Sequence, residues 1–129
     1  MEPVSYRLTL LPSPMSLCRL APDAGIPDWV ENASLLSITR TNDELSIICD
    51  AHLVPENVQA EGGWRAFKMI GPLEFTMVGV LAAILNPLAE AQVSILAIST
   101  YDTDYVLVTD PDLPAALAAL HQAGHQVSV

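Results

Sequence analysis

The chain has 129 residues, 51% of them hydrophobic, and its 15 acidic against 5 basic residues give a formal net charge of −10. This length holds one domain with a sizeable core or two small units that share one, and the apolar content excludes a disordered acidic tail. Because no Lys or Arg follows Lys68, the second half is not expected to bind nucleic acid or anionic lipid.

The first half predicts strands with little helix between them. Residues 6–11 (YRLTLL) read as a strand, and 22–32 (PDAGIPDWVEN) as the remnant of a helix. Residues 34–49 are apolar, then polar, then apolar, which predicts a β-hairpin. A few residues after Asp50 stand for a second helix, and 54–64 (VPENVQAEGGW) read as a linker.

The second half predicts the complete order strand, helix, strand, strand, helix, strand. Residues 65–70 form the first strand, and 94–109 (SILAISTYDTDYVLVT) form a second hairpin. Residues 112–127 predict the second helix, with Pro114 tolerated near its start and Gly124 closing it, before a last short strand 126–129.

The first helix of this half is expected within 76–92, with Thr76 as its N-cap and Pro87 as a kink. Its expected core-facing side chains recur at spacings of three, four and three residues: Val78, Leu81, Leu85 and Leu88.

The two halves read as copies of one unit. Residues 34–49 match 94–109 without a gap at an offset of 60, which sets Leu45 on Tyr105 and Ile47 on Leu107. We therefore predict an α+β fold with a degenerate unit over residues 1–60 and a complete βαββαβ unit over 61–129, each an antiparallel sheet with helices on one face. The second hairpin is apolar on both faces, so the first copy or a second chain is expected to cover it.

The segments 71–91 (GPLEFTMVGVLAAILNPLAEA) and 94–108 resemble the ACT domain. More narrowly, they are similar to the tandem-ACT branch that includes small bacterial proteins and the animal cytosolic arginine sensors. The resemblance implies two ferredoxin-like units in tandem. It also implies a regulatory protein that binds an amino acid, acts as a homodimer, and has a regulated protein as a further partner.

The resemblance places the ligand between the turn that enters the first helix and the hairpin. Carried over by position, the implied ligand-binding residues are Gly71, Pro72, Leu73, Phe75, Thr76, Val78, Gly79, Thr100, Tyr101, Asp102, Thr103 and Asp104. A matching site in the first copy is not expected, because its turn reads TRTNDE in place of STYDTD.

The chemistry of a free amino acid suits these residues. The start of a helix offers unpaired N–H groups to the ligand's carboxylate, and Asp102 or Asp104 offers an acceptor to its ammonium. The alternative interpretation is that both aspartates only stabilise the turn, since Asp side chains bond nearby backbone groups. Glu74 disfavours an anion at the same turn.

A dimerisation module and an enzyme are the two alternative classes of function. A ligand-independent dimerisation module would also explain the doubly apolar hairpin. An enzyme is not expected, because no nucleophile stands with a base and no glycine-rich phosphate loop occurs. His121 and His125 are four apart, but Gly124 separates them, so neither metal nor cofactor is expected.

Location and redox state follow from composition. The longest apolar run, 79–91, contains Asn86, Pro87 and Glu90 and is too short to span a membrane, while the start MEPVSYR lacks the basic and apolar parts of a signal peptide. We therefore expect a cytoplasmic protein without membrane contact. Cys18 and Cys49 have no metal or redox spacing and are expected to be buried free thiols.

Overall fold

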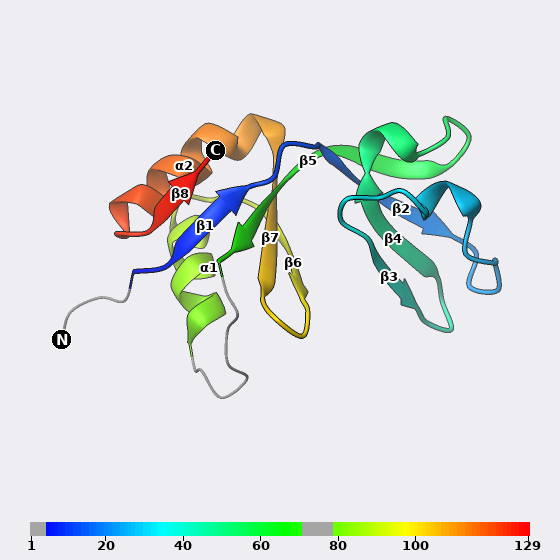
Figure 1. Ribbon diagram of the computed structural model, residues 1–129, viewed down its shortest axis with the longest axis horizontal. Coiled ribbons are helices and arrows are strands. Elements are labelled where there is room, and N and C mark those ends of the chain that lie inside the picture. The colour runs from blue at the N-terminus through cyan, green and yellow to red at the C-terminus, as the bar shows by residue number, and fades with distance from the viewer. Residues whose placement is uncertain (1–4, 71–78) are drawn as a thin grey trace. The chain divides into compact units, whose positions relative to one another are not determined.

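The computed structural model describes residues 5–70 and 79–129 (Figure 1). Its contacts form two compact units. The N-terminal unit runs from Ser13 to Trp64, and the C-terminal unit joins the residues up to Pro12 with those from Arg65 onward. These packing units differ from the predicted domains 1–60 and 61–129, because the first strand of the chain packs with the C-terminal unit.

The C-terminal unit has an α+β fold in which two helices lie on one face of a sheet (Figure 1). Its strands lie in the order β6–β7–β5–β1–β8. The elements are β1 (Arg7–Leu10), the end of β5 (Gln59–Met69), α1 (Val80–Glu90), β6 (Ile95–Ser99), β7 (Asp104–Thr109), the 3-10 turn η3 (Asp110–Asp112), α2 (Leu113–Gln122) and β8 (Gln126–Ser128). From β5 onward this is the predicted βαββαβ order.

Strand β1 is an addition to that order and lies between β5 and β8. It pairs antiparallel with β5, where Leu8 faces Met69, and parallel with β8, where Leu8 faces Val127. In a βαββαβ unit the first and last strands run in opposite directions, so a strand inserted between them must run parallel to one of the two. The prediction of a strand at 6–11 is confirmed, but its assignment to the first copy is wrong.

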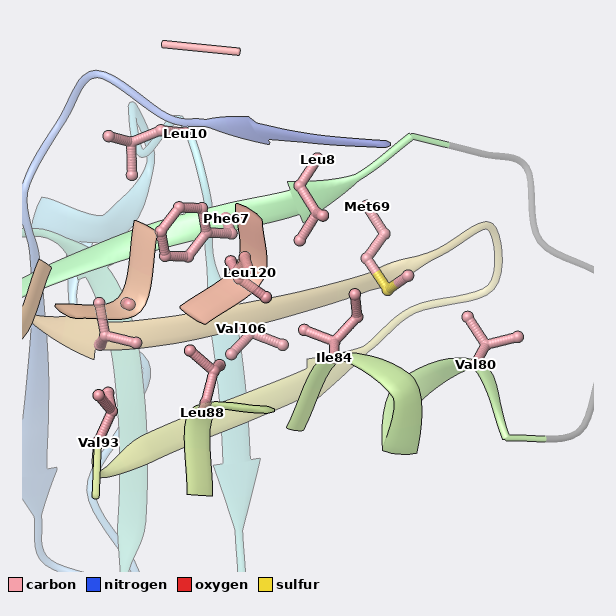
Figure 2. Packing of buried hydrophobic residues seen from close by; sticks show 12 residues of the cluster. Leu8, Leu10, Phe67, Met69, Val80, Ile84, Leu88, Val93, Val106 and Leu120 are labelled. Carbon is pink, nitrogen blue, oxygen red and sulfur yellow. The ribbon is translucent and has the colours of Figure 1, made fainter. Parts of the chain in front are cut away.

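The core of the C-terminal unit fills the layer between the sheet and the helices (Figure 2). Leu8, Phe67 and Met69 from the sheet meet Ile84 from α1 and Leu120 from α2 in this layer. Each of these side chains is at most 1% exposed. Burying one such side chain contributes roughly 1.5–3 kcal/mol, so the two chain segments that build the sheet are held together mainly by this layer.

Helix α1 buries a face slightly different from the predicted one. Val80, Ile84 and Leu88 are buried, whereas Leu81 and Leu85 are half-buried at the edge of the same cluster. The prediction that names Thr76 and Val78 falls outside the described residues. In α2, Pro114 lies in the first turn as predicted, and Gly124 follows the helix with a positive φ of 92°.

Pro87 lies inside α1, and His125 makes up for the hydrogen bond that it removes. Proline has no N–H, so the carbonyl of Ala83 four residues earlier receives no helical hydrogen bond. The Nε2 atom of His125 lies 3.0 Å from that carbonyl oxygen, and the backbone N–H of Tyr6 donates to Nδ1 at 3.1 Å. Because a backbone N–H can only donate and a carbonyl can only accept, Nδ1 of the buried imidazole is the acceptor and Nε2–H is the donor in these two hydrogen bonds.

This arrangement predicts that His125 matters less once Pro87 is removed. His125→Phe keeps a packed ring but leaves two partly buried backbone groups without partners, so we expect a loss of about 2 kcal/mol in unfolding free energy. In a Pro87→Ala background, the new N–H of residue 87 donates to Ala83, and the same change should cost about 1 kcal/mol less. Urea unfolding of the four proteins measures this difference, and equal losses in both backgrounds would contradict it.

The N-terminal unit is a four-stranded sheet without an α-helix. Its strands lie in the order β3–β4–β2–β5. The elements are β2 (Met15–Leu20), the 3-10 turn η1 (Asp28–Val30), β3 (Ser37–Arg40), β4 (Leu45–Asp50), the 3-10 turn η2 (Ala51–Leu53) and the start of β5. The prediction of a degenerate unit is confirmed, although β2 was not predicted and β5 already begins at Gln59, within the predicted linker.

The two hairpins are equivalent at an offset of 59 residues, so the predicted offset of 60 is wrong within them. In the β3–β4 turn, the backbone N–H of Thr41 donates to Glu44 O and that of Glu44 donates to Thr41 Oγ1. In the β6–β7 turn, Thr100 and Thr103 make the same two hydrogen bonds. The strands that follow begin at Leu45 and at Asp104, respectively.

Burial supports the same equivalence. Ile47 faces the core of the N-terminal unit, and Val106, 59 residues later, faces the core of the C-terminal unit. A shift of one residue moves every side chain of a strand to the other face of the sheet. The predicted pairing of Ile47 with Leu107 therefore joined side chains from opposite faces.

Asp50 organises the polar part of the N-terminal unit. Asp50 is only 3% exposed. Its carboxylate accepts hydrogen bonds from the backbone N–H of Ser34 at 2.7 Å and from the Ser34 hydroxyl at 2.6 Å. Burial raises the pKa of this carboxyl, but hydrogen bonds from Ser34, Ser13 and Leu35 outweigh it, so the pKa lies below its ordinary value. The ionised carboxylate of Asp50 thus connects the end of β4 to the segment before β3 by hydrogen bonds.

Cys18 and Cys49 are free and fully buried, as predicted. Burial raises the pKa of Cys18, and burial together with the neighbouring Cys18 and Asp50 raises the pKa of Cys49 to about 11. A thiol must ionise to react, so both behave as core side chains rather than as reactive groups.

Candidate ligand-binding site

The predicted hairpin residues form a turn that Thr100 closes. Its N–H donates to Thr103 O at 2.8 Å, its hydroxyl donates to the same oxygen at 3.0 Å, and Thr103 N–H donates back to the hydroxyl at 3.2 Å. Threonine and aspartate suit such a turn because their side chains bond the backbone locally. Tyr101 lies at the tip with 80% of its surface exposed.

Thr103 fixes this turn to the end of β5. It is 6% exposed, and its hydroxyl donates to the carbonyl oxygen of Met69 at 2.8 Å. The hairpin turn therefore lies beside Met69, the last residue of β5. The hairpin part of the implied site is thus fixed to the end of β5, and residues 71–78 lie outside the described residues.

The two aspartates of the second hairpin, Asp102 and Asp104, take different positions. Side chains alternate along a strand, so Asp104 lies on the same face of β7 as Val106 and Val108, which is the face toward the helices. It accepts a hydrogen bond of 2.6 Å from the hydroxyl of Ser99, its cross-strand partner. Asp102 is exposed within the turn.

The start of α1 belongs to the same end of the layer. Met69 and Val80 lie close to each other there in Figure 2. Gly79 precedes the helix with a positive φ of 80°, a conformation that favours glycine, and among the residues that the structure describes no side chain caps the helix start. A helix start carries unpaired N–H groups and the positive end of the helix dipole, which are suited to a carboxylate.

The predicted site residues thus fall into two groups. The structure brings Thr100, Thr103 and Asp104 together with the end of β5, while Asp102 and Tyr101 face outward. Gly71, Pro72, Leu73, Phe75, Thr76 and Val78 lie outside the described residues, as does Glu74, so their roles stay predictions. The sequence alone did not indicate Met69 O, because it is a backbone group, or the bond of Ser99 to Asp104.

The N-terminal unit does not repeat this arrangement. At the position of Asp104 it has Leu45, which is fully buried in the core. The carboxylate that faces the helix layer in one unit is therefore replaced by an apolar core residue in the other.

The described residues contain neither a cluster of metal ligands nor a membrane-spanning helix. Within 5–70 and 79–129, no group of three or more His, Cys, Asp or Glu side chains is arranged to hold a metal ion. Neither helix of the described chain has the length and apolar character needed to cross a membrane.

Comparisons with known proteins agree with this fold. A family model described as "ACT domain" matches residues 59–122, and a second model, described as an N-terminal domain, matches residues 15–57. The structure of protein Atu0741 from Agobacterium tumefaciens is 35% identical with a TM-score of 0.91, over 96% of this chain and 92% of that one. The chain therefore belongs to the ACT-domain family, and more narrowly it is a tandem ACT-domain protein.

Two further relatives extend the comparison. The human protein CASTOR3P is 34% identical over 74 residues, which are 57% of this chain and 42% of that protein. The chain thus matches less than half of the length of this curated relative. The regulatory subunit of aspartate kinase from Thermus thermophilus has the same fold, with a TM-score of 0.62 and 13% identity over 91% of this chain and 94% of that one.

Proposed function

We propose that this protein is a regulatory amino-acid sensor of the ACT-domain family and not an enzyme. The observation that carries the proposal is Asp104, a carboxylate on the helix-facing side of β7, together with the N-terminal end of α1 on the same side of the sheet. A free amino acid has an ammonium and a carboxylate, and these two features match it in charge. Family membership supports a regulatory role, since one relative of the same fold is a regulatory subunit.

In this proposal Thr100 and Thr103 hold the turn, Asp104 accepts from the ammonium, and the segment from Gly71 to Gly79 supplies the remaining contacts. The C-terminal unit is the sensing half. Binding of the amino acid in turn regulates a protein partner, and the protein acts in the cytoplasm.

We also propose that the protein forms a homodimer. Strand β6 pairs with β7 on one side, and no described strand pairs with its other side. Its residues Ile95–Ser99 contain no charge or proline, the features with which soluble proteins usually protect a free edge. This edge is also the observation that favours the alternative function, a dimerisation module that needs no ligand.

Screening the twenty amino acids by thermal shift tests the proposal. A true ligand at a hundred times its dissociation constant should stabilise the fold by about 2.7 kcal/mol. Asp104→Asn keeps an acceptor for Ser99 but removes the charge, so the affinity for that ligand should fall at least tenfold, about 1.4 kcal/mol. Calorimetric titration measures the affinity.

Asp102→Asn is the matched control. It changes the same residue type two positions away, on an exposed part of the turn, and should bind the ligand as the parent protein does. If no amino acid stabilises the protein while light scattering gives a dimer, the dimerisation module is favoured. If both variants weaken binding equally, the assignment of Asp104 is wrong.

A further inference from the structure

The sheet of the N-terminal unit has an open face that the proposed sensing site does not use. Cys18, Leu45 and Ile47 face the core of the unit, so their neighbours in the strands lie on the opposite face. Strand pairing arranges these neighbours in rows across the sheet: Arg19 lies between Ser46 and Gln59, and Leu17 lies between Ile48 and Glu61.

This open face contains a hollow of about 390 Å³. The volume lies within the roughly 300–1,000 Å³ of small-molecule sites in proteins. The hollow is lined by Leu17, Cys18, Arg19, Glu44, Ser46, Gln59, Ala60 and Glu61. All of these residues belong to the N-terminal unit. The lining thus combines one cation, two carboxylates, two neutral polar side chains, two aliphatic residues and one cysteine.

The opposite charges in the hollow do not neutralise each other. The one salt bridge among the described residues joins Arg65 to Asp110, so Arg19 is not paired with Glu44 or Glu61. Arg19 is nevertheless held in place, because its guanidinium donates to the carbonyl oxygen of Asp43 at 3.1 Å. One hydrogen bond to a carbonyl uses one of the five N–H groups of a guanidinium.

We propose that this hollow is a second small-molecule site, separate from the proposed sensing site, and that it takes a zwitterionic amino acid. Arg19 binds the carboxylate, because a guanidinium presents paired N–H groups that match it. Glu61, which lies diagonally opposite Arg19 across the β2–β5 pair, accepts from the ammonium. Leu17 contacts the aliphatic part of the ligand, while Ser46 and Gln59 hydrogen-bond its polar groups.

Nuclear magnetic resonance of the full chain labelled with ¹⁵N tests the proposal, with L-leucine and L-glutamine as probes. We expect at least one of them to shift the amide signals of Leu17, Ser46 and Gln59. Leucinamide or glutaminamide, which lack the carboxylate, and the N-acetyl amino acids, which lack the ammonium, should each bind at least tenfold more weakly. Arg19→Gln and Glu61→Gln should each weaken binding of the parent amino acid at least tenfold.

Arg40→Gln is the control for Arg19→Gln. Arg40 also donates to backbone carbonyls of its own unit, those of Pro22 and Ala24, but it does not line the hollow. This variant should bind as the parent protein does. Equal loss in both variants would overturn the proposal. So would binding of the amide and N-acetyl analogues as tight as that of the parent amino acid, or no shift on β2, β4 and β5 with either probe. Shifts confined to 99–104 would do so while leaving the proposed sensing function intact.

Discussion

Leu8→Asp is expected to unfold the C-terminal unit. Leu8 is 1% exposed and packs in the core between β5, β8 and the helices, so the change places a charge where neither water nor a partner can reach it. The loss should exceed 4 kcal/mol, which is a large part of the 5–15 kcal/mol that stabilises a typical domain. Hydrogen exchange measured by mass spectrometry should show rapid exchange in α1, α2 and β8.

Arg7→Asp is the matched control, because it places the same charge one residue earlier on the exposed face of the same strand. It should change the stability by less than about 0.5 kcal/mol. A chain that starts at residue 13 should lose the same protection as Leu8→Asp, and a synthetic peptide of residues 5–12 should restore it. Full protection in the truncated chain without the peptide would show that β1 is dispensable.

Asp50→Ala is expected to destabilise the N-terminal unit by about 3 kcal/mol. The change leaves the hydroxyl and the backbone N–H of Ser34 without their acceptor, and hydrogen bonds to a charged group contribute about 1.5–3 kcal/mol each. Fluorescence of Trp29 and Trp64, which both belong to this unit, follows its unfolding in urea. Asp43→Ala, in an exposed turn of the same unit, should cost much less.

The contribution of Asp50 should also depend on pH in a defined direction. Its pKa in the folded protein lies below that of an unfolded Asp, about 3.9, so the folded state binds this proton less readily than the unfolded state. The stabilisation is therefore complete above about pH 4 and disappears as the pH falls through the folded pKa. The difference between parent and Asp50→Ala should shrink from pH 5 to pH 2. A constant difference would contradict an ionised Asp50.

Local pattern in the sequence predicted the elements of the C-terminal unit well. The hairpin at 94–109 consists of two apolar runs around a Thr and Asp turn, and the first helix has apolar residues at spacings of three and four. These signals come from neighbours in the chain. The position of β1 could not be predicted in this way, because its pairing with Met69 and Val127 depends on residues far away in the sequence.

The site was predicted only as a region. The sequence indicated Asp102 and Asp104 together, and the structure separates them because Asp102 lies in the exposed turn, whereas Asp104 is the first residue of β7 and lies on its helix-facing side. The gap-free match at an offset of 60 joined the two hairpins one residue out of register. It could not show that Asp104 occupies the place of the buried Leu45.

The position of β1 also sets an order of events during biosynthesis. The ribosome makes β1 first, but its partners β5 and β8 follow much later, and the Tyr6 contact to His125 spans 119 residues. The strands β2, β3 and β4 of the N-terminal unit are synthesised before either partner of β1, so they can pair with each other while β1 is still unpaired. A nascent chain released before β8 is complete should therefore leave Leu8 and Leu10 uncovered and available to chaperones, so the stability of β1 depends on a strand that is synthesised much later.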